Sequence, residues 1–189
     1  MPARTPRMPP IPDAQMTDAQ KQVTAAMVAG PRGGLIGPFV PLLRSPDFMD
    51  RLQKTGEYLR YNSAFTPRLS ELAILITARH WSQNFEWYAH RPIAEKAGLR
   101  VSIIEAVAEG RRPAEMAIDE AAIWDFLDEL IRTKTVSATT YQRILGMFGE
   151  RGVIDLIGIH GYYSLLAMVL NVTQAPLPGD AKPGLDPLP

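Results

Sequence analysis

Cysteine is absent from the 189-residue sequence, and its absence excludes two kinds of site. The chain forms no disulfide bond and offers no thiolate ligand to a metal ion, which fits a reducing compartment. An excess of charge is also missing, since 20 Lys and Arg residues balance 20 Asp and Glu residues. No block of five or more basic residues occurs, so we expect no nucleic-acid partner.

Long uninterrupted apolar segments are missing as well. The first twelve residues, MPARTPRMPPIP, contain basic residues but lack the apolar core of a secretory signal. No apolar run reaches the roughly 20 residues that a membrane-spanning helix needs. We therefore expect a soluble, cytoplasmic protein without a membrane partner.

Several motifs that mark nucleotide, hydrolase and zinc sites are absent. The sequence has no HExxH motif and no GxSxG nucleophile elbow. The run GPRGG, which begins at Gly30, lacks the Lys-Ser/Thr pair that completes a phosphate-binding loop. With these site types excluded, Glu and His residues are the remaining candidates for chemistry.

Strand patterns are absent too: no segment alternates cleanly between apolar and polar residues, and no Asn-Gly hairpin occurs. Helical periodicity and capping residues are common, so the sequence predicts an all-α fold. A helical domain over residues 15–174 is expected between Pro-rich extended arms at residues 1–14 and 175–189. The expected helices cover residues 17–30, 45–62, 67–81, 82–98, 102–110, 117–133, 137–149 and 153–172.

Residues 68–98 contain the longest apolar run and the densest cluster of aromatic residues. Thr66 and Pro67 are suited to the N-cap and first position of a helix. The following segment, residues 72–78 (LAILITA), is apolar on nearly every face, which predicts a helix buried on all sides. Glu71 stands at the start of this run, either near the helix dipole or in a cavity.

The second half of this stretch contains the clearest acid–base arrangement. Glu86 and His90 are four residues apart and share a helix face, with Gln83 one turn earlier. A carboxylate one turn from an imidazole can orient the ring and raise its basicity, as a general acid–base group requires. Simple packing of His90, or a surface position for Glu71, is the alternative.

The pattern ExxxL at Glu71 followed by EWxxH at Glu86 resembles the carboxymuconolactone decarboxylase family, which includes the alkylhydroperoxidase D proteins. Residues 32–46 and 160–171 extend the resemblance, which covers roughly residues 15–178. In the hydroperoxidase branch a Glu precedes the active-site His by nineteen residues, as Glu71 precedes His90. Gln83 and Glu86 occupy the two cysteine positions of that branch. Thiol peroxidase activity is thereby excluded, and the decarboxylase branch remains.

The resemblance implies a helical bundle of this family type that assembles as a dimer, trimer or hexamer. It also implies a lyase without a cofactor, acting on a small carboxylated lactone or enolisable acid. His90 would transfer the proton, while Glu86 and Glu71 set its charge and position. The substrate would be bound by Arg44, Arg79, Trp87, Phe39 and Gln83.

Other functions remain open at this point. The same groups fit isomerisation, elimination or lactone hydrolysis, and the fold also suits a non-catalytic oligomeric binding protein. Glu71, Glu86 and His90 are possible metal ligands, but no second histidine lies one turn from His90. We therefore expect no metal.

Overall fold

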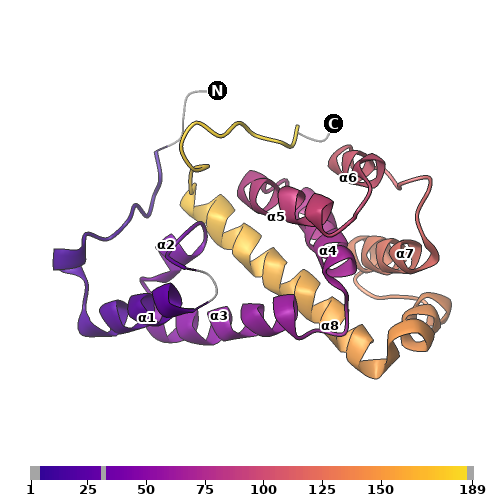
Figure 1. Cartoon of the computed structure of the whole chain (residues 1–189), viewed down its shortest axis with the longest axis horizontal. Helices are drawn as coiled ribbons and strands as arrows, with labels where there is room; N and C mark the ends of the chain where they lie inside the picture. Colours follow the sequence, from indigo (N-terminus) through magenta and orange to yellow (C-terminus); the bar gives the residue numbers. More distant parts are fainter. Residues whose placement is uncertain (1–4, 31–32, 187–189) are drawn as a thin grey trace.

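A computed structural model describes residues 5–30 and 33–186. Residues 1–4, 31–32 and 187–189, which include parts of both expected arms, lie outside the described residues. Over the described ranges the chain is helical and has no strand, which confirms the all-α class (Figure 1). The elements are the 3-10 helix η1 (Asp13–Gln15) and helices α1 (Asp18–Ala29), α2 (Phe39–Leu42), α3 (Pro46–Tyr61), α4 (Pro67–His80), α5 (Asn84–Lys96), α6 (Val101–Ala108), α7 (Ile118–Thr133) and α8 (Ala138–Thr173).

Helix α4 is the central element of the fold. It packs against α3, α5, α6, α7 and α8, and Figure 1 shows it enclosed among them. Every residue from 69 to 79 is buried, so the prediction of a helix buried on all sides is confirmed. Pro67 occupies the first turn as expected, whereas the Thr66 side chain makes no capping hydrogen bond. This central position places Glu71 and Arg79 in the interior.

The first helices follow the predicted boundaries closely. Thr17 and Gln20 form a capping box at the start of α1. In α3 the buried stripe contains Met49, Leu52, Gly56 and Leu59, whereas Phe48 and Thr55 are exposed. The helix packs on α1 and α8.

Helix α5 ends as predicted, with Gly98 in the left-handed conformation (φ 89°) just after the helix. Helix α6 begins one residue earlier than the expected range 102–110, with Arg100 as its N-cap and Ser102 inside the helix. Glu105 of α6 binds Arg91 of α5.

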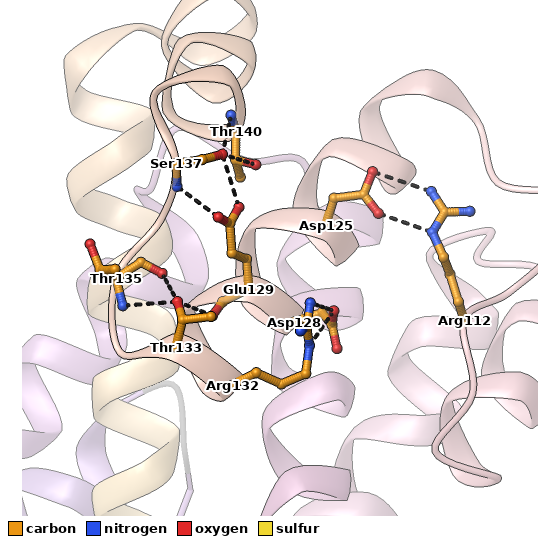
Figure 2. A network of polar contacts seen from close by, with 9 residues as sticks. All are labelled: Arg112, Asp125, Asp128, Glu129, Arg132, Thr133, Thr135, Ser137 and Thr140. Atoms are coloured by element: carbon orange, nitrogen blue, oxygen red, sulfur yellow. Dashed lines mark hydrogen bonds and ion pairs between the residues drawn. The ribbon is translucent and has the colours of Figure 1, made fainter.

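The connection from α7 to α8 is held by the polar network in Figure 2. Glu129 of α7 accepts a hydrogen bond from the Ser137 amide at 2.8 Å, and the Ser137 hydroxyl caps α8 at Thr140. Arg112 makes a two-pronged ion pair with Asp125. The bonds fix the reversal of direction that lets α8 return across α4.

Helix α8 was expected as two helices separated near Gly149. It is one element whose backbone leaves the helical conformation at Gly149, with φ 69° and ψ −179°. By length and composition α8 could cross a membrane, although the sequence shows no uninterrupted apolar run of that length. Half of its most apolar window is buried within the fold.

The described parts of both arms lie against their own chain. The Arg7 amide donates to the carbonyl of Thr173 at 2.8 Å, and Arg44 donates to the carbonyl of Pro9 at 2.6 Å. On the other arm, Leu185 is buried and its amide donates to Asn84 of α5 at 2.9 Å. Figure 1 shows the C-terminal segment running over α5.

Candidate functional site

Three predicted site residues meet between α4 and α5. Nδ1 of His90 lies 2.7 Å from Oε2 of Glu71, and its Nε2 lies 3.6 Å from Oε2 of Glu86. Glu71 is 4%, Glu86 3% and His90 5% exposed. Two carboxyl groups therefore flank one imidazole in the interior.

The two contacts of the imidazole have different roles. An ionised carboxylate only accepts hydrogen bonds, so the Nδ1–H of His90 donates to Glu71. Nε2 is then the ring nitrogen that faces Glu86. When the ring of His90 is neutral, the lone pair of Nε2 faces Oε2 of Glu86. When Nε2 carries a proton, that proton lies between Nε2 and Oε2 and is attracted to both atoms. The geometry thus suits proton exchange at Nε2.

A residue that the sequence did not single out completes the surroundings of the imidazole. The ring of Tyr163 in α8 meets the His90 ring edge-on, with centroids 5.0 Å apart, and Tyr162 packs against Tyr163 in the same manner. Burial raises the pKa of Tyr163 well above its ordinary value, and the charges of Glu86 and Glu71 add to this effect. The phenol therefore stays protonated. Two adjacent tyrosines in the long apolar helix α8 were the available signal.

Gln83 is close to Glu86 and His90 in sequence, and its side chain makes two hydrogen bonds within the fold. Its oxygen accepts a hydrogen bond from the Phe85 amide at 2.5 Å and so caps α5. Its nitrogen donates to Asn171 of α8 at 2.8 Å. The Gln83 side chain thus fixes α5 against α8, and the residue also lines a surface hollow of about 470 Å³ with Leu170 and Asn171.

Trp87 is also buried, under the C-terminal segment. Gly184 packs so closely on the indole that an added Cβ would lie 2.8 Å from Cδ1 of Trp87. The indole Nε1 is buried and has no hydrogen-bond partner among the described residues. Trp87 therefore combines packing with an unused donor.

Arg79 is the buried cation of the central helix. It is 4% exposed, and its Nη1 donates to the backbone carbonyl of Asp186 at 2.7 Å. Burial lowers the pKa of Arg79, while the nearby charge of Asp186 raises it. Its place in the last turn of α4 is favourable for a positive charge.

The other two predicted substrate-binding residues lie elsewhere. Arg44 is exposed, and its guanidinium donates to the carbonyls of Val40 and Pro9, so it holds the N-terminal arm. Phe39 is buried in α2 as part of the core. The loop before α2 meets α5 where Gly37 packs against Phe85.

The surface hollows that we describe do not open onto Glu71, Glu86 or His90. The largest has a volume of about 590 Å³ and lies between the two arms, the loop before α2, and α5. It contacts α5 through Phe85 and Tyr88, which are on the side of the helix away from His90. The enclosed cavity expected of an enzyme is therefore not among these hollows.

His80 and His160, which have no evident partner in sequence, are close in space, with ring centroids 6.2 Å apart. The Thr77 hydroxyl donates to the Ala73 carbonyl and therefore accepts from the Nδ1–H of His160 at 3.0 Å. Burial lowers the pKa of His160 to about 4, and the charges of His80 and Lys134 act in the same direction. His160 is thus neutral at pH 7.

The Glu71–His90–Glu86 group does not fit a metal ion that all three residues bind. The two carboxylates lie at opposite nitrogens of the ring, whereas ligands of one ion must converge to about 2 Å from it. In the described part of the chain, no three His, Asp or Glu side chains form a potential metal cluster.

Neither a protein-family model nor a curated protein matches this chain. The resemblance to the carboxymuconolactone decarboxylase family thus depends on the sequence motifs alone.

Proposed function

We propose that this chain is a cofactor-free lyase of the carboxymuconolactone decarboxylase type, with the corresponding helical bundle. The observation that carries the proposal is the buried imidazole of His90 between Glu71 and Glu86. Such a group can hold a proton and deliver it where water is excluded. The substrate class is a small carboxylated lactone or enolisable acid.

The proposed reaction needs one proton. The bond between the substrate and its leaving carboxylate breaks, CO₂ departs, and the electron pair remains as an enolate. His90 donates the Nε2 proton to the resulting carbanion, and Glu71 stabilises the imidazolium through Nδ1–H. Solvent then restores the proton to Nε2, with Glu86 as the neighbouring acceptor. Proton transfer of this kind contributes about 10²–10⁴-fold to a rate.

Arg79 is the favoured anchor for a substrate carboxylate that remains after the reaction. It is buried with a positive charge, whereas Arg44 is exposed and bonded to two backbone carbonyls. Trp87 would offer its indole N–H beside the substrate. Gln83 and Phe39 would support the site through packing.

The proposal is tested by a substrate screen with lactones, β-keto acids and vinylogous acids. CO₂ release and incorporation of deuterium from heavy water are measured with wild type and with His90→Gln. We expect both signals in wild type and their loss in the variant. Isomerisation or lactone hydrolysis at the same site would give deuterium exchange or ring opening without CO₂.

A non-catalytic binding protein is the second candidate. It is favoured by the observation that no hollow described here is lined by Glu71, Glu86 or His90. In that case ligands would bind to wild type and to His90→Gln equally, and neither protein would turn over any compound in the screen.

A further inference from the structure

The guanidinium of Arg79 has one edge in use and one edge without a partner. Nη1 donates to the carbonyl of Asp186 at 2.7 Å. Nε and Nη2 are buried and have no hydrogen-bond partner among the described residues. A buried charged donor without a hydrogen-bond acceptor lowers the stability of the fold. A ligand that accepts from this edge would remove that cost.

The chemistry of the unused edge specifies the ligand. Nε–H and Nη2–H are parallel donors on one side of a planar cation, and this arrangement matches the two oxygens of a carboxylate. Lysine cannot reproduce it, because an ammonium is a point charge without a fixed fork. The free edge is therefore selective for a planar oxyanion.

The C-terminal cover, which we define as residues 184–186, lies over this site. Each of its residues contacts α4 or α5: Gly184 packs on Trp87, the Leu185 amide donates to Asn84, and the Asp186 carbonyl accepts from Arg79. The buried, unpartnered Nε1–H of Trp87 lies under the same cover. These three consecutive residues thus cover both Arg79 and Trp87.

An open groove borders the cover. Its volume is about 410 Å³, and its lining includes Trp87, Gly184, Lys182 and Arg91 without an Asp or Glu in the described part of the chain. Arg91 is already paired with Glu95 and Glu105, so Lys182 is the cation that favours an approaching anion. The aromatic wall suits a ligand with a flat apolar body.

We propose that the Nε/Nη2 edge of Arg79, together with Nε1–H of Trp87, binds a carboxylate beneath the C-terminal cover. This proposal deepens the proposed function, because it rests on Arg79 as the carboxylate anchor. It does not depend on the reaction at His90. The carbonyl of Asp186 holds the guanidinium so that the fork keeps one orientation.

Benzoate is the test ligand, with the neutral isostere benzamide and inorganic phosphate as comparisons, and calorimetry reports binding. We expect wild type to bind benzoate more tightly than benzamide or phosphate. Arg79→Lys should lower the ratio of benzoate affinity to benzamide affinity about tenfold or more, which is the scale of a charge-assisted bidentate pair. Trp87→Phe keeps an aromatic ring but removes the indole N–H, and it should lower this ratio by a smaller factor.

Leu185→Ser tests the cover, because it loosens a buried anchor without touching the donors. It should weaken benzoate binding, whereas Leu177→Ser, a half-buried leucine earlier in the same arm, should not. Benzoate binding is measured without any turnover, so a failure of the reaction proposal is recognised separately. Equal binding of benzoate and benzamide, an unchanged preference in Arg79→Lys and Trp87→Phe, or tighter phosphate binding would overturn the inference.

Discussion

The imidazole of His90 donates its Nδ1–H to Oε2 of Glu71 across 2.7 Å, while its other nitrogen lies 3.6 Å from Glu86. The two carboxylates are therefore not equivalent. Glu71 fixes the tautomer and the orientation of the ring. Glu86 is next to the nitrogen to which we assign the proton transfer, so substitutions at the two positions should have different effects.

His90→Gln should fold normally, because glutamine is a good helix former and can still donate to Glu71. On any substrate that wild type converts, we expect kcat to fall by about 10²-fold or more, because the proton donor is lost. Glu86→Gln should reduce kcat less, since the imidazole remains. Steady-state kinetics and circular dichroism measure the two effects.

The matched control is His80→Gln, a histidine at the end of α4 that is exposed. It should leave kcat near the wild-type value. Near-wild-type turnover by folded His90→Gln would contradict the assigned role of the imidazole.

Glu71→Leu should lower the free energy of unfolding by about 1–3 kcal/mol, because it leaves a buried Nδ1–H without its acceptor. Glu71→Gln should cost less, since its amide oxygen can still accept that hydrogen bond. Urea titration measures both variants, with the half-exposed Glu95→Gln as control. Wild-type stability of Glu71→Leu would mean that the pair is not formed in solution.

Two glycines in α8 should respond oppositely to alanine. Gly149 has φ 69° and ψ −179°, a region open almost only to glycine, so Gly149→Ala should destabilise the fold by about 1–3 kcal/mol. Gly146 is helical and has open space around it, so Gly146→Ala should stabilise by about 0.5–1 kcal/mol. Thermal unfolding of both variants measures the difference, and equal shifts would argue against the break in α8.

Stability should fall in acid partly through His160. Burial lowers its pKa to about 4 in the folded chain, against 6.5 for an unperturbed histidine. Between these values the unfolded chain binds a proton that the folded chain does not, so stability falls as pH drops from 6.5 toward 4. Because the ring is half-buried and partly screened, we expect a loss of about 1–2 kcal/mol.

Urea unfolding of wild type and His160→Gln at pH 7 and pH 4.5 isolates this contribution. The variant removes the titrating ring and can still donate to the Thr77 hydroxyl. Its loss of stability on acidification should be smaller than that of wild type. An identical pH dependence in the two proteins would assign the acid sensitivity to other groups.

We propose that the chain forms a homo-oligomer through the exposed face of α8. Ile154 is 67% exposed, and Ile157, Met168 and Val172 are exposed at helical spacing on the same face. An apolar face of this kind marks an interface. Ile154→Lys should therefore shift the mass measured by light scattering toward the monomer, whereas Ile118→Lys, at a residue 76% exposed on α7, should not. A monomeric wild type at micromolar concentration would exclude the proposal.

The helices were predictable because their signals are local. Some residues mark helix ends by their own backbone preferences or by short-range capping. Four such residues stand at helix ends in the structure: Thr17, Pro67, Gly98 and Ser137. The start of α6 was predicted one residue late, since Arg100 is its N-cap and Ser102 lies inside the helix.

The acid–base group was predictable in part for the same reason. Glu86 and His90 lie one turn apart on one helix, so their proximity follows from helical geometry. The edge-on contact with Tyr163 joins residues 73 positions apart and depends on how α8 crosses α5. The position of Asp186 over Arg79 depends on the path of an arm without regular structure, which no periodicity encodes.

The turn between α4 and α5 consists of residues 81–83, with Ser82 at φ 45°. Glu71 and His90 are consequently joined by a chain segment of nineteen residues that is almost wholly helical. Contacts of such short sequence separation close with little loss of loop entropy and can form early in folding. The acid–base pair is thus a property of one helical hairpin, and the length of its turn sets the register in which the carboxylate meets the imidazole.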